Sequence, residues 1–188
     1  MLLLAGGGAG IGVWRYARGP GFERETGRLA ALLELRPGMT VADVGAGNGR
    51  IAARLAQRLD AGGRIYATEI DPGKLASIRQ QPALVPVEAT EHSTGLPEAC
   101  CDAIYFRRVY HHVTDRVSFG RGIYAALRPG GRLVAIDMIS ARWLPFLHHG
   151  IARGRVESEL TAAGFTLERV IPRWSPVDYC LVFRKAAR

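Results

Sequence analysis

Strand-like and helix-like patterns alternate from residue 21 to the end of the chain, and this alternation constrains the fold more than any other feature. Short apolar runs bounded by glycine and proline are typical of buried strands, whereas apolar residues spaced three and four apart indicate amphipathic helices. The expected strands are 39–44, 64–70, 84–87, 101–106, 133–139, 165–171 and 178–184. The expected helices are 21–35, 50–59, 72–80, 114–127 (capped by Thr114), and one with Val156, Leu160 and Ala163 on its apolar face, ended by Gly164.

The link between the last two expected strands determines how they pair. It is short and contains proline, so it cannot hold the long crossover that a parallel pair needs, and these strands must be antiparallel. The earlier strands are separated by helices or a long loop, which favours parallel pairing. The sequence therefore predicts an α/β fold: a Rossmann-like, mostly parallel seven-stranded sheet with helices on both faces and an antiparallel C-terminal strand pair.

The 188 residues suit a single domain, which we expect over 21–188. Residues 1–20 form a separate apolar, Gly-rich segment, and 1–13 carry no charge. A helix over those thirteen residues would reach about 20 Å, short of a bilayer core of about 30 Å. We expect either a tail or a weak membrane anchor through 1–18. Because Arg15 and Arg18 follow the apolar run, the rest of the chain is expected in the cytoplasm, peripheral to the inner face of the membrane if the anchor is used.

The net charge of +8 arises mainly from arginines spread along the chain, without a basic run or a nucleic-acid-binding motif. This favours a small-molecule partner over a nucleic acid. The three cysteines, Cys100, Cys101 and Cys180, are odd in number, and two are adjacent, so they do not form a disulfide framework. They also lack the usual zinc spacings. We expect a reducing compartment and no metal site; the oligomeric state stays open.

A glycine-rich loop follows the first expected strand and reads Asp43-Val44-Gly45-Ala46-Gly47-Asn48-Gly49. In open α/β sheets, ligands bind outside the carboxyl ends of the strands. Glycine lets the backbone approach such a ligand closely. The spacing differs from the dinucleotide fingerprint, because the third glycine comes one residue early. The carboxylate of Asp43 also favours a cationic ligand over a pyrophosphate.

A second acidic residue ends the second expected strand. Glu69 follows Gly49 by 20 residues, and an acid at this place can accept hydrogen bonds from both hydroxyls of a ribose. Asp71 is the competing candidate. Because Asp71 directly precedes Pro72, we expect it to cap the next helix instead.

Over residues 22–185 the chain resembles the class I methyltransferases. The matching segments are VADVGAGNGR, RIYATEIDP, GLPEACCDAIYFRRVYHHV, LRPGGRLVAIDM and ELTAAGF. The resemblance implies S-adenosylmethionine as cofactor, with its methionine part at the glycine loop, its ribose at the second-strand acid and its adenine at the loop after the third strand. The implied cofactor-binding residues are Asp43, Gly45, Ala46, Gly47, Glu69, Ile70, Thr90 and Glu91. His92 is an alternative in the third loop, and a solvated loop without ligand contact is another.

The acceptor side begins after the fourth expected strand. Its end places Arg107 at the cofactor mouth, where we expect it to be the ninth cofactor-binding residue. Tyr110, His111 and His112 follow near where an acceptor would enter. A histidine with a pKa near neutral can remove a proton from an acceptor, so His111 and His112 are candidate bases. Alternatively, either histidine shapes the loop. We expect an acceptor pocket from 143–150 and the N-terminal helix, although the same apolar residues suit core packing.

These observations predict an enzyme that transfers a methyl group from S-adenosylmethionine to a small-molecule acceptor, which the sequence does not identify. Lipid or quinone-like molecules are candidates, and the apolar N-terminus is an argument for a lipid. Three alternatives stay open. One is a non-catalytic, regulatory S-adenosylmethionine-binding protein. Another is an NAD-dependent oxidoreductase, disfavoured by the glycine spacing and Asp43. The last is methyl transfer to arsenic, disfavoured because Cys100 and Cys101 are adjacent at the start of a core strand.

Overall fold

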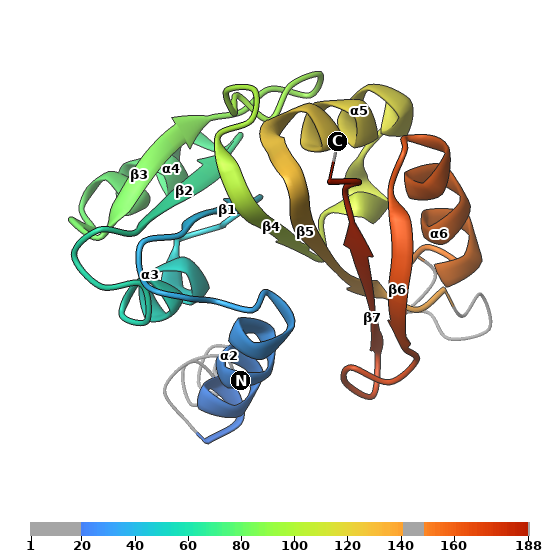
Figure 1. Cartoon of the computed structure of the whole chain (residues 1–188), viewed down its shortest axis with the longest axis horizontal. Coiled ribbons are helices and arrows are strands. Elements are labelled where there is room, and N and C mark those ends of the chain that lie inside the picture. Colours follow the sequence, from blue (N-terminus) through green and yellow to red (C-terminus); the bar gives the residue numbers. More distant parts are fainter. Residues whose placement is uncertain (1–19, 141–148, 188) are drawn as a thin grey trace, which may run out of the picture.

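The computed structural model describes residues 20–140 and 149–187. Their core is one seven-stranded sheet in the order β3-β2-β1-β4-β5-β7-β6 (Figure 1). The strands are β1 (Thr40–Val44), β2 (Arg64–Glu69), β3 (Leu84–Glu88), β4 (Cys101–Arg107), β5 (Leu127–Met138), β6 (Thr166–Ile171) and β7 (Asp178–Arg184). Strands β1 to β5 pair in parallel, and β7 is antiparallel to both β5 and β6. The predicted fold is confirmed, including the antiparallel C-terminal pair.

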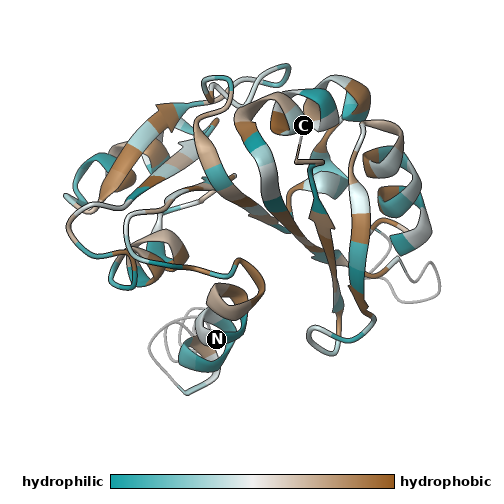
Figure 2. Cartoon of the chain, in the orientation of Figure 1, coloured by the Kyte–Doolittle hydropathy of each residue, from teal (hydrophilic) through white to brown (hydrophobic). Residues whose placement is uncertain are grey.

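Helices cover both faces of the sheet. They are α2 (Pro20–Leu32), α3 (Arg50–Ala56), α4 (Pro72–Arg79), α5 (Arg116–Ala126) and α6 (Arg153–Ala162), with a short 3-10 helix η1 (Tyr110–His112). One hydrophobic cluster joins α2, α3 and α4 to the sheet, and a second joins α5 and α6 to the opposite face. Figure 2 shows hydrophobic residues along the central strands and hydrophilic ones on the outer turns of the helices.

Successive strand residues serve the two clusters in turn. Ala103 and Tyr105 of β4 belong to the first cluster, and Ile104 and Phe106 belong to the second. This follows from the two-residue period of a strand, whose side chains point alternately to opposite faces. A strand covered on both faces must therefore be apolar throughout, which explains the continuous apolar runs in the sequence.

The structure corrects several expected boundaries. Helices α2 and α3 each end three residues earlier than predicted, at Leu32 and Ala56. Helix α5 is capped by Asp115, whose side chain accepts a hydrogen bond from the Ser118 backbone N–H, so Thr114 as cap was wrong. Strand β5 begins at Leu127, earlier than predicted, because Leu127 pairs with Cys101 before a register shift. Asp71 caps α4 as expected, through a 2.9 Å hydrogen bond from the Lys74 backbone N–H.

The topology places one end of β1 at the centre of the molecule. Strand β1 pairs with β2 on one side and with β4 on the other, so the strand order reverses there. The loops that leave the carboxyl ends of these strands diverge at such a point and leave a crevice between them. The glycine loop follows β1 at this position.

The predicted N-terminal tail or anchor lies almost wholly outside the described residues, which begin at Pro20. Among the helices of the described part, none has both the length and the apolar character that crossing a membrane requires.

Candidate functional site

The glycine loop follows β1 and has a backbone conformation that disfavours residues with a side chain. The backbone N–H groups of Gly45 and Ala46 both donate to the carbonyl of Thr68, at 3.0 and 2.9 Å. Gly45 has a φ of 72°, and a Cβ there would lie 2.5 Å from Cγ2 of Val109. Both the left-handed backbone and the contact with Val109 therefore require glycine.

Glu69 ties the end of β2 to this loop. Its Oε2 accepts a 2.7 Å hydrogen bond from the Gly47 backbone N–H. Its Oε1 accepts bonds from the backbone N–H groups of Ile70 and Asp71, at 3.0 and 3.1 Å. The side chain is buried. A carboxylate has about four lone-pair positions, so three backbone donors leave acceptor capacity for a ligand hydroxyl.

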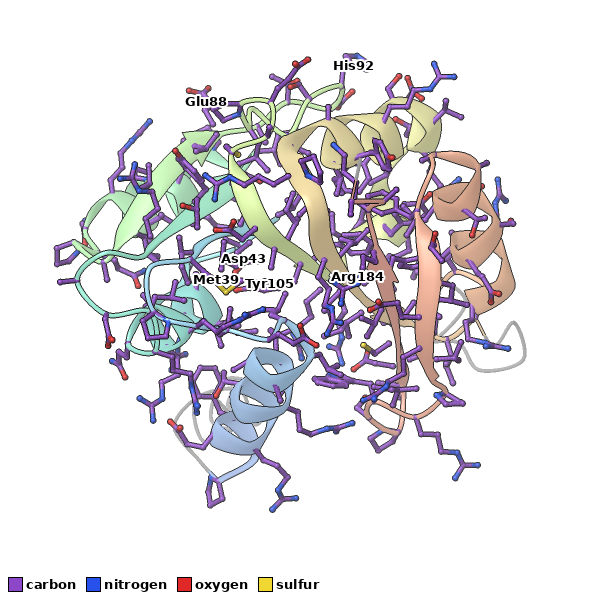
Figure 3. All side chains as sticks on the ribbon, viewed as in Figure 1. Met39, Asp43, Glu88, His92, Tyr105 and Arg184 are labelled. Atoms are coloured by element: carbon purple, nitrogen blue, oxygen red, sulfur yellow. The ribbon has the colours of Figure 1, made fainter. Side chains whose placement is uncertain are left out.

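Asp43 is buried beneath the loop. Its carboxylate accepts a 2.6 Å hydrogen bond from the Tyr105 hydroxyl, and Figure 3 shows the two residues beside each other in the centre of the molecule. Burial raises the pKa of Asp43 to about 7, against the lowering effects of the Tyr105 hydrogen bond and of Arg107. Asp43 is thus only partly ionised near neutral pH, which weakens the charge argument against a pyrophosphate ligand.

Two cavities meet at Gly45, which lines both. The first has a volume of about 270 Å³ and lies over the ends of β2 and β3. It includes the predicted Glu69, Ile70, Thr90 and Glu91; His92, marked in Figure 3, does not line it. Its other lining residues are Val44, Gly45, Thr68, Ala89, Ser93, Thr94, Val109, His112, Val113, Thr114 and Phe119.

The second cavity, of about 290 Å³, lies between the glycine loop and helix α2. It brings together four ionisable side chains: Glu25, Asp43, Arg50 and Arg107. Its remaining lining residues are Phe22, Gly45, Ala46, Gly47, Asn48 and Ile51. The structure therefore places all nine predicted cofactor-binding residues on one cavity or the other.

The two candidate bases have different surroundings. The Nδ1 atom of His111 lies 2.5 Å from Oδ1 of the buried Asp137, and the His111 side chain is only 6% exposed. The His111 backbone N–H also donates to Asp137, at 3.2 Å. His112 is exposed and lines the first cavity. Its pKa is lowered, chiefly by desolvation and then by His111, which favours the neutral ring.

Sequence reasoning missed several lining residues. Phe22 and Glu25 reach the second cavity from α2, which is far from the glycine loop in sequence, and Val109 lines the first cavity from the end of β4. A pattern of apolar or acidic residues on a helix does not say which of them faces a ligand. Only the tertiary fold supplies that information.

The expected acceptor pocket is described only in part. Of 143–150, residues 143–148 lie outside the described part of the chain. The N-terminal helix, the other expected component, lines the second cavity through Phe22 and Glu25.

The fold and site define an α/β protein with a ligand crevice at the strand-order reversal, a glycine loop and an acid at the neighbouring strand end. The sequence model of the methyltransferase domain family matches residues 42–135, half of the chain. A 27-O-demethylrifamycin SV methyltransferase of Amycolatopsis mediterranei is 32% identical over 62% of this chain and 44% of its own length. The chain thus belongs to the family of class I S-adenosylmethionine-dependent methyltransferases.

Solved structures agree on the fold. A SAM-dependent methyltransferase from Aquifex aeolicus superposes with a TM-score of 0.77, at 18% identity over 90% of this chain and 92% of that one. The [4+2]-cyclase SpnF superposes with a TM-score of 0.75, at 18% identity over 88% and 81%. The chain spans about half the length of the curated relatives it matches.

S-adenosylmethionine is the cofactor of this family, and the residues present fit it. The Glu69 carboxylate keeps acceptor capacity for hydroxyls, as described above. Beside Gly47 there is open space: an added Cβ would meet no atom within 4 Å, so a ligand can approach the backbone there. The second cavity holds carboxylates and guanidinium groups that match a ligand end with both an ammonium and a carboxylate.

Proposed function

We propose that this chain transfers a methyl group from S-adenosylmethionine to a small-molecule acceptor. The observation that carries the proposal is the Glu69 carboxylate. It borders the first cavity while holding the backbone of Gly47, which borders the second. One side chain thus links a nucleoside-sized cavity to the glycine loop. The name of the relative from Amycolatopsis mediterranei, a methyltransferase for 27-O-demethylrifamycin SV, supports a small acceptor.

The cofactor, when bound, supplies a methyl group on a positively charged sulfur, which is a good leaving group. The protein's part is therefore mainly to hold and align. Glu69 would accept hydrogen bonds from ribose hydroxyls, and Ile70 would pack against the base from its exposed position. Thr90 and Glu91, which line the same cavity, would also contact the base. Such alignment can account for much of the acceleration of a group transfer.

We propose His111 rather than His112 as the acceptor-side base. The Asp137 carboxylate beside Nδ1 favours the tautomer with the proton on Nδ1, which leaves the lone pair of Nε2 to accept a proton. His112 would instead form part of the wall of the first cavity. The His111 ring itself lines neither cavity, but its centroid lies 3.9 Å from that of the His112 ring. A base is needed only for an acceptor that must lose a proton, so this role concerns hydroxyl or similar acceptors.

Calorimetric titration of the purified chain with S-adenosylmethionine, S-adenosylhomocysteine and NADH tests the proposal. We expect micromolar binding of the first two ligands and none of NADH. Screening of small hydroxylated and lipid-like acceptors for release of S-adenosylhomocysteine would follow. Binding of NADH in preference to the adenosyl ligands would overturn the proposal.

A non-catalytic S-adenosylmethionine-binding protein is the second candidate. Turnover with any acceptor would exclude it. A cytoplasmic location, peripheral to the membrane through residues 1–18, stays a prediction that membrane pelleting with and without these residues would test.

A further inference from the structure

An ion pair joins helix α2 to the end of β4 on the wall of the second cavity. Nε of Arg107 donates to Oε1 of Glu25 at 2.8 Å, and the two side chains are 22% and 9% exposed. Both residues line the cavity. Arg107 therefore stands beside the glycine loop with most of its side chain enclosed.

Trp174, in the link between β6 and β7, holds the Glu25 carboxylate of this ion pair in place. Its Nε1–H donates to the same Oε1 of Glu25 at 3.0 Å, and the indole is buried. Arg28 lies over the Trp174 ring, 4.0 Å from the ring centroid, and donates to the Trp174 carbonyl at 2.9 Å. The Glu25 carboxylate is thus held by donors from two segments more than 60 residues apart in the chain.

The Arg107 guanidinium has donors to spare. Arginine carries five N–H groups in a planar fork that matches a carboxylate. Within the described residues, Nε is the one guanidinium nitrogen of Arg107 with a hydrogen bond. The terminal nitrogens of an enclosed, tethered guanidinium are suited to a paired contact with a ligand carboxylate.

We infer that Arg107 binds the carboxylate at the amino-acid end of the cofactor, and that Glu25, fixed by Trp174, positions the guanidinium for this contact. The inference rests on the proposed function. It assigns a role in cofactor recognition to helix α2 and to the β6–β7 link. Both segments are separate from the glycine loop in the sequence. Arg50 lines the same cavity and is the competing cation.

The test uses two ligands that differ by one group: S-adenosylhomocysteine and its decarboxylated analogue, which keeps the ammonium. Calorimetry should show that the parent protein binds the first at least about tenfold tighter, as expected for a charge-assisted hydrogen-bonded contact. Arg107→Met should reduce this preference to about twofold or less. Arg107→Lys keeps a positive charge for the ion pair but loses the planar guanidinium. It should retain only part of the preference for S-adenosylhomocysteine. Arg50→Met removes the competing cation of the same cavity and should leave the preference between the two ligands in place.

The positioning role has its own variants. Glu25→Gln and Trp174→Phe should lower the preference for the carboxylate while the affinity for the decarboxylated analogue stays within about threefold of the parent's. Glu23→Gln is the control on the same helix, because Glu23 is 48% exposed and pairs with Arg54 outside the cavity. A rise of the preference in Glu25→Gln would show that Glu25 competes with the ligand carboxylate, and would overturn the positioning role.

The outcomes separate the two proposals. A parent that binds both ligands equally, or a loss of preference in Arg50→Met instead of Arg107→Met, overturns this inference and leaves the proposed function standing. A parent that binds neither ligand overturns the proposed function, and this inference with it.

Discussion

The two cavities that meet at Gly45 are assembled in different ways. The first is formed by the loops that follow β2, β3 and β4 together with helix α5, and its walls include Ile70, Val109 and Phe119 around the single strand-end acid Glu69. The second lies between the glycine loop and α2 and concentrates charges of both signs. The first suits the largely neutral nucleoside of the family's cofactor, and the second suits its doubly charged amino-acid end.

This difference also separates what local sequence dictates from what only the fold provides. Strand ends and the turns after them follow from short motifs, so the predicted residues of the first cavity could be located from local sequence. The second depends on a helix docked from elsewhere in the chain. Variants in the two cavities should therefore differ in which part of the ligand they affect.

The largest effect is expected at Gly47. Its φ is 59°, and a side chain there would enter the open space of the second cavity, so Gly47→Val should abolish measurable binding of S-adenosylhomocysteine, a loss of more than about 100-fold. Gly38→Val is the matched control: Gly38 has a φ of 78° and equally open surroundings, but it lines neither cavity. It should lose similar stability and keep its affinity in calorimetry. Equal loss of binding in both variants would refute the placement of the ligand beside Gly47.

The next prediction concerns Asp43, beneath the glycine loop, and the pH dependence of stability. Because burial raises the pKa of Asp43 from 3.8 to about 7, the folded state binds the proton more tightly than the unfolded state. The protein should therefore lose stability as the pH rises from about 4 through about 7, by up to about 4 kcal/mol from this group. Asp43→Asn does not titrate at this position. Urea unfolding at both ends of the pH range should therefore show that the free energy of unfolding of the variant rises relative to that of the parent as the pH rises. A constant difference would mean that Asp43 titrates normally.

Glu69 should show a smaller effect, confined to the first cavity. Glu69→Ala removes the proposed acceptor of the ribose hydroxyls and should weaken binding by about 1–3 kcal/mol. Glu88 pairs with Glu69 in the register of β2 and β3 but is exposed and lines neither cavity (Figure 3). Glu88→Ala should therefore bind S-adenosylhomocysteine like the parent. If Glu88→Ala weakened binding as much, the ligand would lie further out over β3.

The smallest effect on binding is expected on the acceptor side. Asp137 holds His111 and accepts a 2.7 Å hydrogen bond from the Met138 backbone N–H, so Asp137→Asn should cost about 1–3 kcal/mol of stability. Asp137 lines neither cavity, so the affinity of the variant for S-adenosylhomocysteine should stay within about twofold of the parent's. Thermal unfolding and calorimetry would measure both quantities. A large loss of affinity would place Asp137 in the cofactor site.

The sequence allowed prediction wherever a local pattern carries the information. The apolar runs located the strands, and the glycine loop and Glu69 lay at strand ends, where the fold brings them together. Asp115 was missed because it stands beside Thr114, and both residue types cap helices. Glu25 and Trp174 were missed because their contact joins positions 149 residues apart. The raised pKa of Asp43 likewise depends on burial, which composition does not reveal.

A crystal structure of the chain with S-adenosylhomocysteine would test most directly whether the two cavities form one cofactor site. We predict that the ligand spans both, with its ribose hydroxyls on Glu69, its base among Ile70, Thr90 and Glu91, and its amino-acid end beside Arg107. A ligand that occupies only one cavity, or that lies away from Glu69, would contradict this account.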